Sequence, residues 1–234
     1  MAFPTRKLTR FTLGILAFLL TIAWAGESEA ARRRFYVGGG LNTVAPAGGI
    51  DGFKVFTAGP DGPNVYPGKL ADGSGMAVVL FGVNFLNFIA PEVLLNISTH
   101  DSSHSSFPGE NFRAGYFSLY LGGRVFLPLG DSMEIFARGM GGVVGLGYEG
   151  NAEYPPSTTY SDSSFSGSGS GLGGGIRFNL EAIGIEFSYM KQMASFDHVS
   201  LDRDGQTTDF DIDPLEEDFG VVQLIVMWNF GKEL

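Results

Sequence analysis

The sequence ends in a long uncharged segment, Phe219–Phe230 (FGVVQLIVMWNF), that contains no proline. β-branched and aromatic residues dominate the segment, which favours an extended strand. In a strand, one face would carry only apolar side chains, those of Val222, Leu224, Val226, Trp228 and Phe230. The other face would carry the polar residues Gln223 and Asn229. A tilted strand crosses a bilayer with about 9–11 residues, so we predict a membrane strand with lipid on one side.

The N-terminus has the three regions of a secretory signal peptide. Arg6, Lys7 and Arg10 precede an apolar run over residues 11–25, and small residues suited to cleavage follow. The run is too short for a membrane-spanning helix, which needs about 20 residues. We therefore predict a signal peptide over residues 1–25, with cleavage as late as residue 30, and one barrel domain over residues 31–234.

The composition of the exported part narrows the classes of protein. Without the three basic residues of the signal, 12 Lys and Arg stand against 25 Asp and Glu, a net charge of −13. This balance argues against nucleic acid as a partner. There is no cysteine, so stability must come without disulfides. The 35 glycines and 13% aromatic residues suit a strongly curved sheet with aromatic girdles.

Alternating apolar and polar residues predict seven further strands before the last one. They cover residues 35–44, 75–85, 88–98, 112–127, 133–148, 169–180 and 183–193. In the second, we expect Val79, Phe81, Val83 and Phe85 to share a face. The connections alternate between long and short, with long ones at 45–74, 100–111, 149–168 and 194–218. The prolines and glycines of 45–74 predict no regular element there. This alternation places all long loops at one rim, which is typical of an outer-membrane barrel.

Three segments, APEVLLNIS, RVFLPLGDSMEIFARGMGG and GVVQLIVMWNF, carry a resemblance to a known family. Residues 35–230 resemble the small eight-stranded outer-membrane barrels related to outer-membrane protein A and outer-membrane protein X. The resemblance implies an all-β fold, an eight-stranded antiparallel transmembrane β-barrel in the bacterial outer membrane of a Gram-negative cell. It further implies long extracellular loops, short periplasmic turns and insertion by the barrel insertion machinery.

The C-terminus departs from that family in one respect. The family usually ends in an aromatic residue that the insertion machinery reads, whereas Gly231-Lys232-Glu233-Leu234 follow Phe230 in this sequence. The spacing Trp228-x-Phe230 is kept. We interpret the tail as a tolerated extension of the closing strand.

Charged residues on the predicted inner faces suggest how the barrel is filled. They are three acids and three bases: Glu92, Arg124, Glu134, Arg138, Arg177 and Glu186. The lumen of an eight-stranded barrel is just wide enough for side chains. We predict that these six form a buried charge network that plugs the barrel; the alternative is that some lie in water at the rims.

Two predicted loops offer competing functions. The motif His100-Asp101-Ser102-Ser103-His104-Ser105 contains the residue types of a lipid-acyl hydrolase, which needs a base close to a nucleophilic hydroxyl. The stretch 194–218 predicts a solvated acidic loop, whose acids are Asp197, Asp202, Asp204, Asp209, Asp211, Asp213, Glu216, Glu217 and Asp218. Its Asp202-Arg203-Asp204-Gly205 lacks the rest of a calcium loop, although divalent cations could bridge the acids to lipopolysaccharide.

The sequence as a whole predicts a monomeric, non-enzymatic barrel that acts as a surface-interaction, adhesin-like protein through its outer loops. Expected partners are outer-membrane lipids, lipopolysaccharide and a host or extracellular ligand. No cofactor and no metal site is expected. A lipid-acyl hydrolase and a small channel are the alternatives, because fold alone does not choose among them.

Overall fold

The computed structural model describes residues 34–58, 63–85, 88–129, 132–153, 160–180, 182–203 and 206–231. The predicted signal peptide, 1–25, lies outside these residues, and so do the last three residues of the tail. Among the described residues, no helix is long and apolar enough to span a membrane.

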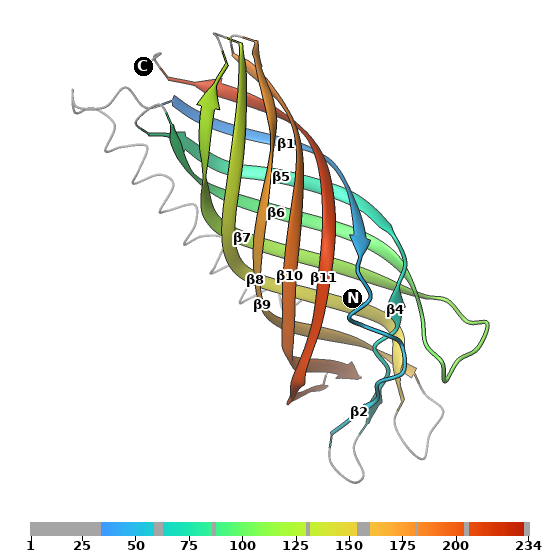
Figure 1. Ribbon diagram of the computed structural model, residues 1–234. Helices are drawn as coiled ribbons and strands as arrows, with labels where there is room; N and C mark the ends of the chain where they lie inside the picture. Colours follow the sequence, from blue (N-terminus) through green and yellow to red (C-terminus); the bar gives the residue numbers. More distant parts are fainter. Residues whose placement is uncertain are drawn as a thin grey trace.

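Eight long strands form a closed antiparallel barrel (Figure 1). They are β1 (Arg34–Pro46), β5 (Gly73–Asn84), β6 (Ile89–Ser103), β7 (Phe112–Pro128), β8 (Met133–Glu153), β9 (Tyr160–Leu180), β10 (Ile183–Arg203) and β11 (Gln206–Phe230). Each strand pairs with its neighbours in the chain, and β1 pairs with β11 from Phe35↔Phe230 to Pro46↔Phe219. This last pairing closes the ring, and the predicted eight-stranded antiparallel fold is confirmed.

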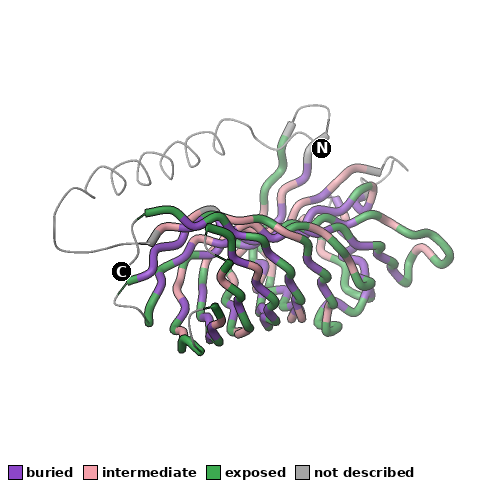
Figure 2. Tube along the Cα trace, turned by 90° about the horizontal axis from the view of Figure 1, so that it is seen from above, coloured by how far each residue is buried: buried purple, intermediate pink, exposed green. Residues whose placement is uncertain are grey.

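Side chains alternate between the two sides of the wall, as the burial colours along each strand show in Figure 2. In β11, the side chains of Val222, Leu224, Val226, Trp228 and Phe230 point outward and are 40–61% exposed. Val221, Gln223, Ile225 and Met227 point inward and are almost fully buried. The closing strand therefore has the apolar outer face that its sequence predicts.

The strands continue well past the apolar band at the long-loop rim. The predicted loops 149–168 and 194–218 are largely wrong, because β8 runs to Glu153, β9 begins at Tyr160, and β10 and β11 continue to Arg203 and from Gln206. In these extensions Phe165, Phe196, Val199, Leu201 and Leu215 are buried on the inner face. Serines and acids cover the outer face, since a strand above the membrane needs only one apolar face.

The first long connection is also more regular than its composition predicts. It contains three two-residue strands, β2 (Phe56–Thr57), β3 (Asn64–Val65) and β4 (Lys69–Leu70). β3 pairs with β8 and β4 pairs with β6, so the segment is hydrogen-bonded to the long-loop ends of two wall strands. Glycine and proline exclude long elements, but they leave room for short bridges to an existing sheet. The prediction of no regular element is wrong for this reason.

A β-bulge changes the faces of β5. The register to β6 shifts between Val79 and Phe81, and Val79 is fully buried in the lumen. After the shift Gly82 faces inward, where an added Cβ would overlap the ring of Tyr36. The prediction that Val79 shares a face with Phe85 is therefore wrong, because a bulge inserts a residue that strict alternation does not allow for.

Candidate functional site

The six charged residues predicted for the lumen all point inward from the barrel wall. Their side chains come from β6, β7, β8, β9 and β10, and each residue is at most 6% exposed: Glu92, Arg124, Glu134, Arg138, Arg177 and Glu186. The structure brings all six together in the half of the lumen nearest the short turns. We call this set the charge network.

Two arginines hold the three glutamates of the charge network. Arg138 places its Nε 2.6 Å from Glu92 Oε2 and its Nη2 2.9 Å from Glu186 Oε1. Arg124 lies 3.0 Å from Glu134 and 3.3 Å from Glu186 through its Nη2 and Nη1. Because Glu92 and Glu186 each contact both arginines, the ion pairs form one cluster rather than separate bridges.

Aromatic rings complete the surroundings of the cluster. The Tyr36 hydroxyl donates a hydrogen bond of 2.5 Å to Glu92 Oε1. The Arg124 guanidinium lies 4.9 Å from the centre of the Tyr36 ring and 5.3 Å from the centres of Phe126 and Phe136. A guanidinium at this distance is attracted by the ring quadrupole, so charge and aromatic packing stabilise the same group.

Among the described residues, Arg177 makes fewer ion pairs than Arg124 or Arg138. Its Nη2 donates to Asn229 Oδ1, and its Nη1 lies 3.8 Å from Glu134 Oε1. Among the described residues, its Nε and Nη1 have no hydrogen-bond partner. Arg177 therefore marks the margin of the cluster on the short-turn side.

A layer of amides and hydroxyls lies above the charge network. Gln223 donates to Asn96 Oδ1 at 2.6 Å, and Asn96 donates to the Ser118 hydroxyl at 3.3 Å. Farther toward the long-loop rim, the Tyr116 hydroxyl donates to Gln192 Oε1 at 2.9 Å and its ring packs on Phe219 with centroids 4.3 Å apart. Polar and aromatic side chains thus continue the filling of the lumen upward.

The upper end of the lumen is occupied by the first long connection, described over residues 47–58 and 63–72, which we call the inner loop. Its Ile50, Val65 and Leu70 are at most 5% exposed. The carboxylate of Glu217, itself buried, accepts hydrogen bonds from the amides of Gly48, Gly49 and Ile50 at 2.9, 3.2 and 2.7 Å. The prediction that Glu217 belongs to a solvated loop is wrong, because this residue faces the lumen from β11.

Two histidines hold other parts of the inner loop. A carbonyl oxygen can only accept, so His100 Nδ1 donates to Ala71 O at 2.9 Å and His104 Nε2 donates to Lys54 O at 2.9 Å. Their second nitrogens are 2.8 Å from the Ser98 hydroxyl and 3.1 Å from the Ser106 amide, which donates. In His104, one ring nitrogen therefore donates and the other accepts.

Two more wall residues complete the attachment. The Tyr148 hydroxyl donates to Gly68 O at 2.9 Å, and Asn151 Nδ2 donates to Tyr66 O at 3.1 Å. Sequence reasoning missed both residues, since they lie where the fifth predicted strand ended or beyond it. The signal that could have found them is their position at the end of the fifth predicted strand, because a longer strand there includes both Tyr148 and Asn151.

The histidine motif lies mostly on a strand, because β6 continues to Ser103. Ser98 and His100 have the spacing of a nucleophile and a base, but both are at most 3% exposed and His100 Nδ1 bonds a backbone carbonyl in place of a carboxylate. A nucleophile must be reached by its substrate. The geometry makes the histidines loop anchors. Among the described residues, no group of three His, Cys, Asp or Glu could hold a metal ion.

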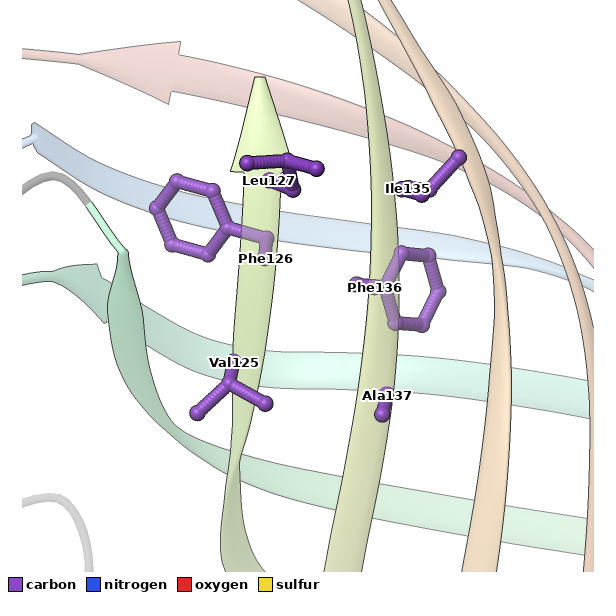
Figure 3. A pocket seen from close by; sticks show the side chains of 6 residues that line it. All are labelled: Val125, Phe126, Leu127, Ile135, Phe136 and Ala137. Atoms are coloured by element: carbon purple, nitrogen blue, oxygen red, sulfur yellow. The ribbon is translucent and has the colours of Figure 1, made fainter. Parts of the chain in front are cut away.

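The outer surface between the rims is apolar. Where β7 ends and β8 begins near a short turn, a shallow hollow of about 420 Å³ is lined by Val125, Leu127, Ile135 and Ala137 (Figure 3). Phe126 and Phe136 complete its lining. Such a surface is compatible with hydrocarbon and unfavourable in water.

Four features now stand together: a closed antiparallel ring, an apolar outer band, a polar lumen, and short turns confined to one rim. Lipid tolerates only spanning structures in which every backbone group is paired. The chain is an outer-membrane-type β-barrel. In this barrel the short turns face the periplasm, and the inner loop and the extended strands face the outside of the cell.

No family model matches the chain of this outer-membrane barrel, and the comparison with curated proteins found no match. One similar solved structure is that of Ail, the attachment invasion locus protein of Yersinia pestis, in complex with the heparin analogue sucrose octasulfate. Ail is 13% identical to this chain, and the match covers 86% of this chain and 100% of that chain, with a TM-score of 0.48. Another is neisserial surface protein A, which is 7% identical. The match covers 87% of this chain and 100% of that chain, with a TM-score of 0.48. A third is the outer membrane protein OprG from Pseudomonas aeruginosa, which is 12% identical. The match covers 85% of this chain and 96% of that chain, with a TM-score of 0.44.

We expect the charge network to stabilise the barrel as a unit. Replacing Arg138 by Met leaves Glu92 and Glu186 short of a partner, and breaking a buried pair in this way costs about 3–5 kcal/mol. Urea unfolding from lipid vesicles measures this loss in the free energy of unfolding. Lys191→Ala, which removes an exposed ion pair with Asp218, is the matched control and should change the free energy far less. Equal effects of the two variants would contradict the role of the charge network.

The attachment of the inner loop should weaken in acid. His100 lies above the apolar band, since Ile97 is the last apolar outward residue of β6 and exposed Thr99 follows. Burial lowers the pKa of His100 below its usual value of 6.5. The folded state therefore favours the neutral ring, and this contribution is complete above about pH 6.5 and is lost as pH falls through the lowered pKa. NMR signals of Gly68 and Ala71 should broaden at that lower pH, and in His100→Gln this transition should be absent.

Proposed function

We propose that this protein is a non-enzymatic, monomeric outer-membrane barrel with a sealed lumen, which acts as a surface-interaction protein through its outer loops. The observation that carries the proposal is the closure of the lumen at two separate levels. The charge network fills the periplasmic half, and the inner loop fills the outer end.

The way the inner loop is attached supports a role for the outer surface. Five side chains from outside the inner loop form hydrogen bonds with its main-chain groups: those of Glu217, His100, His104, Tyr148 and Asn151. These bonds fix the path of the loop, and its exposed side chains face outward: Asp51, Phe53, Lys54, Val55 and Lys69. A fixed backbone lowers the entropy cost of binding, which favours recognition.

The extended strands add a second outer surface beyond the membrane. Four outward acids of β11 are exposed, Asp209, Asp211, Asp213 and Glu216, and Asp218 is half-buried. This surface repels anionic lipopolysaccharide unless divalent cations bridge the two. We propose an extracellular or host ligand as the partner of the outer loops, and outer-membrane lipids as the partner of the apolar band.

The alternative functions make different demands on the structure. A small channel needs a continuous water path, which would have to pass both the buried ion pairs of the charge network and the inner loop. A lipid-acyl hydrolase using His100 would need its nucleophile at the lipid surface, whereas Ser98 is buried in the lumen. The arrangement of the described side chains meets neither requirement.

Recording from planar bilayers tests the sealed lumen. The wild-type barrel should show no steady conductance, because the buried ion pairs of the charge network occupy the lumen. Glu217→Ala, which removes the acceptor for three inner-loop amides, should also remain closed, since the charge network lies below it. A continuous conductance in the wild-type protein would contradict the proposal and favour the channel.

A further inference from the structure

A hollow opens on the outer surface between the inner loop and the hairpin that joins β6 to β7. Its volume is about 420 Å³, within the range of sites for small molecules. The residues that line it include Asp51, Phe53, Lys69, Ser105, Glu110 and Asn111. We call it the outer pocket, and we propose that it binds one or two units of a neutral saccharide. This inference rests on the proposed surface-interaction function and names its ligand class.

The two walls of the outer pocket are fastened to each other. The Ser105 amide donates to Gly52 O at 3.0 Å, and His104 Nε2 donates to Lys54 O at 2.9 Å. Within the hairpin, the Glu110 amide donates to Phe107 O at 3.1 Å. The pocket therefore exists before a ligand arrives, which spares a ligand the cost of ordering it.

The lining of the outer pocket matches the chemistry of sugar hydroxyls. A hydroxyl both donates and accepts hydrogen bonds. Asp51 and Glu110 offer carboxylate acceptors, Lys69 offers an ammonium donor, and Asn111 and Ser105 offer both. Several such groups around one hollow suit a ligand with many hydroxyls better than a wholly apolar ligand.

Phe53 supplies an apolar surface in the same place. Its side chain is 72% exposed, while the Phe53 amide donates to Asp51 Oδ1 at 3.0 Å and fixes the local backbone. An aromatic side chain left in water carries a hydrophobic cost that a covering group removes. The C–H face of a pyranose ring is such a group, and its hydroxyls would at the same time reach the polar lining.

The charge of the outer pocket selects a neutral ligand. The described residues that line it carry two carboxylates and one ammonium group. The small negative excess disfavours phosphates, sulfates and acidic sugars. It also falls short of the concentrated charge that a cation alone would need.

NMR titration of the full-length mature barrel in lipid nanodiscs tests the inference. The probes are glucose, galactose, N-acetylglucosamine and lactose, with inorganic phosphate and choline chloride as charged comparators. At least one sugar should shift the amide signals of Phe53, Ser105 and Asn111 in a saturable way. Phe53→Ala should weaken binding at least tenfold, whereas Val55→Ala, an exposed apolar residue of the same loop outside the lining, should leave it unchanged.

Contrary results separate this inference from the proposed function. If the barrel is folded and closed to ions, and no sugar shifts these signals, the saccharide site is refuted while the sealed surface protein stands. Shifts with phosphate or choline but with no sugar refute it equally. If a membrane-impermeant amine reagent added to intact cells fails to label the exposed side chains of Lys54 and Lys69, the loops are not presented outside, and both proposals fall.

Discussion

Backbone hydrogen bonding in lipid is the constraint on which this structure depends. A strand edge left open in hydrocarbon exposes N–H and C=O groups that nothing can pair, at several kcal/mol each. Pairing of β1 with β11 over twelve residue pairs, from Phe35↔Phe230 to Pro46↔Phe219, removes both edges at once. Closure then determines the interior, because a ring of eight strands has a narrow lumen that side chains are large enough to fill. The apolar residues are left to face outward.

The filling of that lumen requires charges to be balanced among themselves. Three arginines and three glutamates share one buried space, and several oxygens and nitrogens serve two partners. Isolated, any one of these ions would be too costly to bury. Small residues make the space: an added side chain at Gly82 would overlap Tyr36, whose hydroxyl bonds Glu92. The inner loop closes the other end by the same principle, with Glu217 satisfied by three amides.

The sequence predicts the membrane part of this fold well because period-two alternation is a local signal. In β11 this alternation places Trp228 on the outer face and Met227 on the inner face. It also places Glu92 and Arg138 inside the barrel, although the sequence does not show which residues they pair with. The bulge in β5 breaks that period, so Val79 was assigned to the wrong face. The strand extensions were missed because their outward serines and aspartates read as loop. The anchors Glu217, Tyr148 and Asn151 were missed because their partners are backbone groups, which no side-chain pattern reveals.

The direction of the side chains along the closing strand is the most direct test of this account. A fluorescent label placed at each position from Val221 to Phe230 in turn would be exposed to a quencher attached to lipid acyl chains. Quenching should alternate, strong at Val222, Leu224, Val226 and Trp228 and weak at the positions between them. Uniform quenching along the strand, or a maximum at Gln223 and Ile225, would contradict a barrel with lipid outside and a sealed interior.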